Sequence, residues 1–458
     1  MRTIGIDIGT TSITGLVYDL EHRRVLHQIT AKNSAHISGC GRIWERLQDP
    51  SAILGLVQGI SEQLLSREPE VQGIGFTGQM HGIVYIDAAG KHVSPLYTWQ
   101  DGRGSVPYDE FHTHAQKLSE DTGYPVAPGY GLATHFYNLR HGLVPIEAVS
   151  LCTIADYAAM RLAESSEPVI DSTQAAGLGC YSLPNGAFDM AAIERSGIHS
   201  DLLPRVVQSG TLVGLTRQGI PVYTSLGDNQ ASFIGSVPFP EEALLLNIGT
   251  GSQLSAMLTG SIGRIEGLEA RPYPGGGVLM VGAALSGGKS YALLEKFYRQ
   301  VIEAYSGQPQ QEVYPLLDKL LEDGPVTAEG LTVNPQFLGT RLNPEARGSV
   351  EGITLDNFTP GLLAHAFLQG ITDELYAFYS TIEQMGSGKT WSRLIGSGNA
   401  LRANPALRSK VEARFGLPLI LSAASEEAAV GAALCAAVGA GGIPSFQEAG
   451  QFLNEQVE

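Results

Sequence analysis

The stretch TIGIDIGTTSITGLVYD, residues 3–19, is the part of the sequence that decides the predicted fold. Apolar and small residues alternate along it, and Gly9, Thr10, Thr11 and Ser12 interrupt the alternation. This pattern predicts a strand, a tight turn and a returning strand, which together form a β-hairpin.

A second hairpin of the same kind is predicted about half a chain later, at residues 243–258. There Leu-Leu-Leu-Asn-Ile runs into Gly249-Thr250-Gly251-Ser252, and both turns contain the tripeptide Ile-Gly-Thr. Two such hairpins, each near the start of an expected domain, predict an internal duplication. Two unrelated hairpins are the alternative.

The chain has 458 residues, more than a single hydrophobic core usually organises, so two domains are expected. Gly235–Glu242, which contains two prolines, is the best candidate for the connection. The predicted domains are residues 1–238 and 239–458. Strands such as Val278–Ala283 and helices such as Tyr291–Tyr305 and Thr359–Gln384 are expected together, which indicates an α/β architecture.

The charge balance limits the possible partners. With 29 Lys and Arg against 46 Asp and Glu, the formal net charge is −17, which argues against nucleic acid or an anionic membrane as the main partner. A small anionic substrate remains compatible, because backbone N–H groups can bind phosphate inside an acidic protein.

Membrane insertion and metal binding through cysteines are not expected. The apolar segment 428–442 is too short to span a membrane and predicts a buried helix capped by Ser425. The first residues lack the apolar run of a signal peptide, so a cytoplasmic protein is expected. The four cysteines have no CxxC spacing and predict neither a zinc site nor a redox pair: Cys40, Cys152, Cys180 and Cys435.

The two Gly-Thr turns could bind phosphate groups. A turn of small residues after a strand exposes consecutive N–H groups, and hydroxyls such as those of Thr10 and Thr11 add donors. Asp7 lies just before the first turn, where its carboxylate could hold Mg²⁺ against the phosphates. Capping of the turn is the alternative role for Asp7.

Asp228 is the candidate catalytic base. It follows the predicted strand 221–225, close to the start of a small-residue helix expected near Ala231. A carboxylate there could accept a hydroxyl proton as the oxygen attacks phosphorus. The alternative is a helix N-cap, which is a common role for aspartate in this setting.

Two polar clusters suggest a sugar site. Gln79-Met80-His81-Gly82 lies between predicted strands, and Trp99-Gln100-Asp101-Gly102-Arg103 places an aromatic residue beside an acid and a base. Sugars bind to such mixtures of an apolar platform and directed donors and acceptors. The alternatives are a satisfied core histidine and a structural salt bridge.

Two segments resemble the end of a P-loop but do not complete it. They are Gly288-Lys289-Ser290 and Gly388-Lys389-Thr390. The motif needs a glycine five positions before its second glycine, and those positions hold Ala283 and Glu383. Neither segment is therefore expected to be a P-loop.

Taken in order along the chain, these motifs resemble the FGGY family of carbohydrate kinases. The matching segments are Asp7–Ser12, Gln79–Gly82, Asp101–Arg103, Gly227-Asp228, Gly249–Gly251 and Gly396–Gly398. The resemblance extends from Ile4 to about Ala437. It implies two actin-like (ribonuclease-H-like) α/β domains flanking a central cleft, the first binding the sugar and the second the nucleotide.

The resemblance also implies a role for each candidate residue. Asp228 is the implied catalytic base, and Asp7 is the implied acid near Mg²⁺. The implied sugar-binding residues are Gln79, Met80, His81, Trp99, Asp101, Arg103 and Asn229. The implied ATP-binding residues are Thr10, Thr11, Ser12, Gly249, Thr250, Gly251, Gly287, Gly288, Gly396, Gly398 and Asn399.

Within the family, residues 98–103 and 129–134 are most similar to sedoheptulokinases, and xylulokinases come next. The implied reaction is ATP-dependent phosphorylation of the terminal hydroxyl of a ketose, with sedoheptulose first and D-xylulose or another polyol as alternatives. A non-catalytic nucleotide-binding regulator of the same fold is the remote alternative, and a homodimer is one assembly left open. The chain departs from the family at Thr340, where many relatives carry Glu before Arg341, and at Ser397, where they carry a third glycine.

Overall fold

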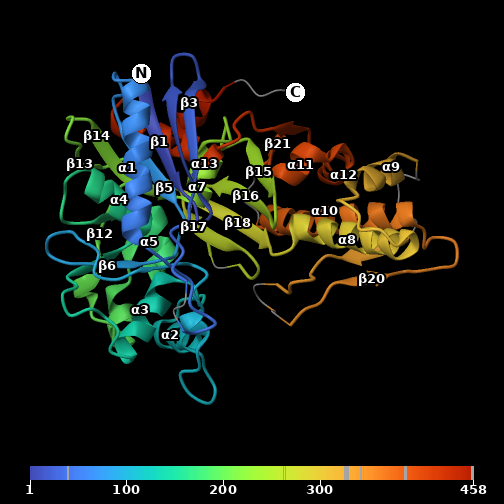
Figure 1. The fold of residues 1–458 in the computed structure, drawn as a ribbon, viewed down its shortest axis with the longest axis horizontal. Coiled ribbons are helices and arrows are strands. Elements are labelled where there is room, and N and C mark those ends of the chain that lie inside the picture. The colour runs from blue at the N-terminus through green and yellow to red at the C-terminus, as the bar shows by residue number, and fades with distance from the viewer. Residues whose placement is uncertain are drawn as a thin grey trace. The chain divides into compact units, whose positions relative to one another are not determined.

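The computed structural model describes residues 1–38, 41–260, 262–263, 265–323, 330–340, 343, 345–385 and 389–454. Cys40, Arg341 and Gly388 from the sequence analysis lie outside these ranges. The described chain divides into two compact units (Figure 1). No helix among the described residues combines the length and apolar character needed to cross a membrane.

The first unit comprises residues 1–239, 271–277 and 424–454. Its strands are β1 (Arg2–Ile8), β2 (Ser12–Asp19), β3 (Arg24–Lys32), β4 (Leu47–Gln48), β5 (Ile74–Gly78), β6 (Val84–Ile86), β7 (Leu96–Tyr97), β8 (Ser150–Cys152), β9 (Val169–Asp171), β10 (Tyr181–Ser182), β11 (Ala187–Phe188), β12 (Arg205–Val207), β13 (Leu212–Leu215) and β14 (Pro221–Gly227). Its helices are α1 (Pro50–Arg67), α2 (His114–Thr122), α3 (Gly131–Arg140), α4 (Ile154–Leu162), α5 (Ser172–Leu178), α6 (Met190–Arg195), α7 (Asp228–Ile234), α13 (Glu427–Gly439) and α14 (Phe446–Ala449), with 3₁₀ turns at Gly102–Ser105, Ser200–Leu202 and Gly450–Phe452.

The second unit comprises residues 240–270 and 278–423. Its strands are β15 (Ala243–Ile248), β16 (Ser252–Leu258), β18 (Val278–Ala284), β19 (Thr332–Asn334), β20 (Ser349–Glu351), β21 (Arg393–Ser397) and β22 (Leu419–Leu421). Its helices are α8 (Gly287–Ser306), α9 (Tyr314–Asp323), α10 (Pro360–Gln384), α11 (Asn399–Ala403) and α12 (Pro405–Phe415). Strand β17 (Glu269–Pro272) runs across the division at Arg271.

The main sheet of the first unit has the strand order β13-β14-β5-β1-β2-β3. Strands β14, β5 and β1 are parallel, whereas β2 and β3 continue as antiparallel hairpin strands. Alternate residues of β1 face opposite sides, so Ile6 packs in a core with α1 while Gly5 faces α13. In Figure 1, α1 runs in front of these strands.

The sheet of the second unit repeats this plan. It contains the strand order β18-β16-β15-β21-β22. Strands β15 and β16 form an antiparallel hairpin, and β18 pairs antiparallel with β16. Strands β21 and β22 are parallel to β15. The equivalent order in the first unit is β3-β2-β1-β5-β14. The structure therefore bears out the internal duplication, and Asn247 in β15 occupies the position that Asp7 occupies in β1.

The division of the chain differs from the predicted domain limits. Residues 424–454 and 271–277 belong to the first unit, although the prediction placed them in a continuous second domain. The physical reason for the first segment is close packing between small residues. A Cβ added to Gly5 would lie 1.9 Å from the Ala429 carbonyl oxygen, and one added to Gly75 would lie 2.0 Å from that of Ala432. Helix α13 can therefore lie directly on β1 and β5.

The starts of three helices also differ from the sequence expectations. Helix α13 begins at Glu427 after Glu426, two residues beyond Ser425, so Ser425 does not cap it. Helix α7 begins at Asp228 rather than near Ala231. Helix α8 begins at Gly287, although a helix only from Tyr291 was expected, because the two glycines at its start pack against a neighbouring turn instead of ending the helix.

Candidate functional site

The parallel strands β1, β5 and β14 end together at one edge of the first sheet. In the register, Ile8 lies beside Gly78, and Gly78 lies beside Gly227. The residues at these ends, Asp7, Gln79-Met80 and Asp228, are therefore brought to the same edge, although more than 200 positions separate the first from the last. Ligands of open α/β sheets bind at such carboxyl ends.

Asp7 is half-buried inside β1, opposite Thr14 and Thr77. Among the described residues its carboxylate makes no hydrogen bond and no ion pair, so it caps no turn there. Burial raises the pKa of Asp7 to about 7, and the negative charges of Asp228 and Glu426 add to the increase. A carboxylate in this environment gains from a bound cation.

Asp228 is the first residue of α7, and Gly227 holds the N-cap position, so Asp228 is not the helix cap. Burial raises the pKa of Asp228, while the positive charge of Arg271 and a hydrogen bond from the Asn229 backbone N–H oppose the increase. The neighbouring Asn229 Oδ1 atom is buried without a hydrogen-bond partner. A carboxylate with a raised pKa is a stronger base than an exposed one.

Gln79, Thr10 and Trp99 form a hydrogen-bond chain at this edge. The Thr10 hydroxyl donates to Gln79 Oε1 over 3.4 Å and accepts from Trp99 Nε1 over 3.1 Å. Gln79 Nε2 in turn donates to Gln48 Oε1 over 2.9 Å. The Trp99 ring is 45% exposed, so it offers an apolar surface beside these polar groups.

Met80 and His81 follow β5. His81 has φ +74°, donates from Nδ1 to the Gly177 carbonyl oxygen over 2.6 Å and stacks on Tyr130 with ring centroids 4.5 Å apart. In the neutral ring, this tautomer leaves Nε2 as an acceptor. Met80 is buried, and its Sδ lies 2.7 Å from the position of a Cβ added to Gly227, so any larger residue before Asp228 would displace the Met80 side chain.

Asp101 and Arg103 form a buried ion pair. Arg103 Nε donates to Asp101 Oδ1 over 2.6 Å, the guanidinium lies 4.0 Å from the centroid of the Tyr97 ring, and Asp101 Oδ2 accepts the Arg46 backbone N–H. Neither residue makes a hydrogen bond or ion pair with Asp7 or Asp228 in the described chain. The salt bridge, one of the two predicted alternatives, is present, and sugar contact by Asp101 or Arg103 stays a prediction.

The remaining candidates gather in the second unit, around the turn between β15 and β16. The Gly288 and Lys289 backbone N–H groups donate to the Gly249 and Thr250 carbonyl oxygens over 2.9 and 3.1 Å. A Cβ added to Gly288 would lie 2.2 Å from the Gly249 oxygen. The start of the 20-residue helix α8 is thus held against the Gly-Thr turn, and a helix start is a favourable place for phosphate.

Gly396, Gly398 and Asn399 lie where β21 ends and α11 begins. Gly398 has φ +88°, and a Cβ there would lie 2.5 Å from the Ile248 carbonyl oxygen. Because β21 runs parallel to β15, this loop and the Gly249 turn share one edge of the second sheet. The Asn247 side chain donates to Ser397 Oγ over 2.9 Å, which gives the departure at Ser397 a structural role.

Three residues of the first site were missed by the sequence analysis. Arg271 carried no motif at all, because it comes from a separate segment of the chain. Tyr130 lay inside the segment 129–134 that resembles sedoheptulokinases, so a signal existed. Glu426 carried no motif; it lies immediately before α13.

A magnesium site built from protein ligands alone is not present among the described residues, where no group of three or more His, Cys, Asp or Glu side chains converges. The donor set still fits Mg²⁺ bound together with a nucleotide, since this ion is commonly held by one or two carboxylates, phosphate oxygens and water. Asp7, whose carboxylate makes no hydrogen bond or ion pair within the described chain, is the residue that fits.

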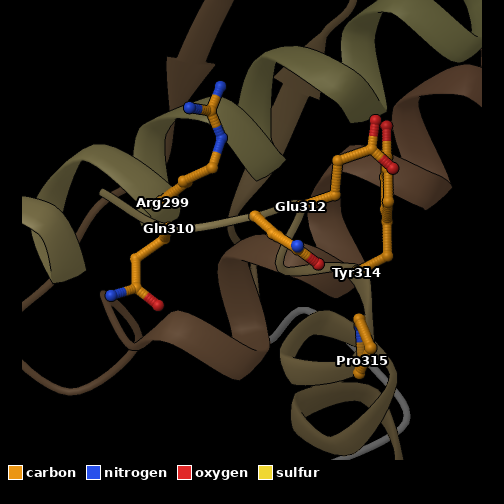
Figure 2. Close-up of a pocket in the computed structure, with 6 residues that line it drawn as sticks. Arg299, Gln310, Glu312, Tyr314 and Pro315 are labelled. Atoms are coloured by element: carbon orange, nitrogen blue, oxygen red, sulfur yellow. The ribbon is translucent and has the colours of Figure 1, made fainter. Parts of the chain in front are cut away.

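A cavity of about 670 Å³ in the second unit is separate from these candidates (Figure 2). It is lined by Arg299, Gln310, Gln311, Glu312, Tyr314 and Pro315. None of these is a predicted site residue, and Arg299 already pairs with Glu295 and Glu303 on its own helix. The cavity therefore adds nothing to the candidate site.

Comparison with known proteins follows the same two-part division. The N-terminal domain model of the FGGY family of carbohydrate kinases matches residues 2–235, and the C-terminal domain model matches residues 244–440. Sedoheptulokinases from Mus musculus and Homo sapiens are 28% and 29% identical, each alignment covering 94% of this chain and 96% of the relative. A xylulose kinase from Staphylococcus xylosus is 24% identical, with coverages of 97% and 92%.

Solved structures agree on the fold. A gluconate kinase from Lactobacillus acidophilus superposes with a TM-score of 0.85 over 100% of this chain and 92% of its own, at 21% sequence identity. Together with the repeated sheet, this similarity confirms the predicted architecture of two actin-like α/β domains.

Proposed function

Because the chain belongs to the FGGY family of carbohydrate kinases, we propose that it transfers the γ-phosphoryl group of ATP to the terminal hydroxyl of a ketose, sedoheptulose, to form sedoheptulose 7-phosphate. Family membership makes the protein a sugar kinase that uses ATP. The choice of sugar and the roles of individual residues belong to the proposal.

The observation that carries the mechanism is the meeting of Asp7, Met80 and Asp228 at the ends of three adjacent parallel strands. Asp228 accepts the proton of the terminal hydroxyl while that oxygen attacks the γ-phosphorus and the bond to the leaving ADP oxygen breaks. Its raised pKa makes it a stronger base than an exposed aspartate. His81 and Gln79, held by hydrogen bonds, orient the sugar, and Trp99 offers an apolar surface to its carbon skeleton.

Asp7 is the residue that would hold Mg²⁺ with the nucleotide. Bound there, the ion neutralises charge on the phosphates. The proposal gains support from the negative charge of Asp228, which helps to raise the pKa of Asp7, because a cation bound at Asp7 would relieve that repulsion. Asn247, the equivalent residue of the second unit, carries no charge, which is consistent with a single metal position.

The ATP phosphates are assigned to the Gly-Thr turns and the start of α8, and the adenosine to the loop at Gly396–Asn399. In both places a glycine lets two backbone segments approach closely, Gly288 against the Gly249 oxygen and Gly398 against the Ile248 oxygen, and this close packing fixes the shape of the two loops. Thr10, Thr11 and Ser12 provide the corresponding turn in the first unit.

Two observations support sedoheptulose as the sugar: the similarity of residues 98–103 and 129–134 to sedoheptulokinases, and the two curated relatives with that name. Xylulose is the second candidate, because a curated xylulose kinase also aligns along 97% of the chain. Both sugars are ketoses with a terminal hydroxyl, so the same base and phosphate loops serve either reaction.

The test is ADP release with ATP and Mg²⁺ in the presence of sedoheptulose, D-xylulose, L-ribulose, D-gluconate, glycerol or D-fructose. The highest kcat/KM with sedoheptulose supports the proposal. Preference for another sugar replaces only the substrate. Folded, ATP-binding protein that releases no ADP with any of them contradicts the proposal and favours a nucleotide-binding regulator.

A further inference from the structure

Residues 271–277 lie between two strands of the second unit in sequence, yet they pack within the first unit. Three contacts hold them there. Gln230 Nε2 of α7 donates to the Pro272 carbonyl oxygen over 3.2 Å, and Tyr273 meets the Phe233 ring edge-on with centroids 5.9 Å apart. Gln447 Nε2 donates to the Gly275 carbonyl oxygen over 3.1 Å. The segment is therefore fixed to α7, the helix that begins at Asp228.

This anchoring brings the Arg271 guanidinium to the sugar side of the site. Its Nη1 atom lies 4.0 Å from the Met80 sulfur, and Met80 itself packs on Gly227, the residue before Asp228. The charge of Arg271 interacts with that of Asp228, and Tyr130, which stacks on His81, lies within electrostatic range of the same guanidinium. One cation thus faces the base, the methionine and the aromatic partner of the histidine.

We propose that Arg271 binds the sugar directly, donating hydrogen bonds from its guanidinium to hydroxyl oxygens next to the one that reacts. This inference rests on the proposed function. A guanidinium has five N–H donors and no acceptor, whereas the Asp228 carboxylate, His81 Nε2 and the unpartnered Asn229 Oδ1 are acceptors. Arg271 therefore supplies the donors that complement the acceptors around a polyhydroxylated ligand.

Burial makes such a contact selective. Burial lowers the pKa of Arg271, which means that its charge is poorly hydrated where it lies. In a site built to donate to a hydroxyl, an analogue without that hydroxyl leaves the donor unpaired and is strongly rejected. Arg271 is accordingly a residue that reads the hydroxyl pattern of the sugar.

The experiment compares wild type with Arg271→Met and Arg271→Lys, using sedoheptulose, or D-xylulose if the wild type prefers it, and the monodeoxy analogues of that sugar. For Arg271→Met we expect the sugar KM to rise about 10- to 100-fold, as for loss of a hydrogen bond to a charged group, with the ATP KM unchanged. Arg271→Lys retains the positive charge but lacks the planar guanidinium, so its sugar KM should lie between those of wild type and Arg271→Met. Arg217→Met, which changes an arginine of the same unit whose side chain is 85% exposed, is the matched control and should keep the wild-type sugar KM.

The analogues separate a direct contact from a structural role. One monodeoxy sugar should be poor for the wild type, and Arg271→Met should bind that analogue and the parent sugar equally well. Two outcomes overturn the inference while the kinase function stands. In the first, Arg271→Met still binds every analogue more weakly than the parent sugar. In the second, the sugar KM of Arg271→Met equals that of wild type. If Arg271→Met does not fold, the same comparison in Arg271→Lys decides. Absence of sugar-dependent ADP release by the wild type defeats the proposed function instead.

Discussion

Asp7 and Asp228 lie at the ends of two strands that flank β5, and the charge of Asp228 helps to raise the pKa of Asp7. Two like charges on one sheet edge cost folding free energy unless a cation or a proton joins them. Arg271 partly offsets this cost for Asp228, and the position of Asp7 is therefore better explained by catalysis than by stability. These two residues lead to the first two predictions.

Replacement of the proposed base should stop turnover but spare binding. In Asp228→Ala we expect kcat to fall by about 10²–10⁴-fold or more, since Asp7, the other carboxylate described at this edge, is assigned to Mg²⁺. Calorimetric titration should still detect sugar binding, and the exposed control Asp356→Ala should match wild type. Normal turnover in Asp228→Ala would remove this residue from the mechanism.

Asp7→Asn should lose activity and gain stability. The native pKa of Asp7 is about 7 against an ordinary value of 3.8, so the native state binds more protons than the unfolded state between these values and wild-type stability falls as pH rises through that range. Asn cannot ionise, so the variant does not lose stability in this way. We expect its free energy of unfolding to exceed that of wild type by about 1–3 kcal/mol at pH 8 and to differ little at pH 4. Denaturant titrations without Mg²⁺ measure both values. Equal pH dependence in both proteins would contradict the assigned environment.

Gly288→Ala should weaken the second unit and its use of ATP. The added Cβ would meet the Gly249 carbonyl oxygen at 2.2 Å, so the start of α8 must move away from the Gly-Thr turn. We expect a lower melting temperature and a higher ATP KM, with the sugar KM little changed. Gly55→Ala in α1, where a Cβ meets open space, should instead stabilise the protein by up to about 1 kcal/mol.

The buried pair of Asp101 and Arg103 should act mainly on stability. Arg103→Met leaves the Asp101 carboxylate buried without its cation, which typically costs about 3–5 kcal/mol. Arg217→Met breaks an exposed ion pair with Glu164 and should cost less than about 1 kcal/mol. Chemical denaturation measures both variants. A stable Arg103→Met protein with a greatly raised sugar KM would instead assign Arg103 to sugar binding.

Local patterns predicted much of the secondary structure. The hairpin at residues 3–19 is confirmed as β1 and β2, and the second Gly-Thr hairpin as β15 and β16. The helix expected at Thr359–Gln384 is confirmed as α10, which has Thr359 as its cap and Pro360 at its first position. These elements depend on alternation, caps and turn residues close together in the chain, so their signals are visible in the sequence.

By itself, the sequence determined the doubled α/β plan, the family resemblance and the strand ends that carry Asp7, Met80 and Asp228, because each depends on a short segment with its own pattern. Only the tertiary structure decided that residues 271–277 and 424–454 join the first unit, and with them Arg271 and Glu426. These placements come from packing between segments hundreds of residues apart, such as Gly5 against Ala429, which no local pattern encodes. The raised pKa values of Asp7 and Asp228 arise in the same way, from burial and charges that only the folded chain brings together.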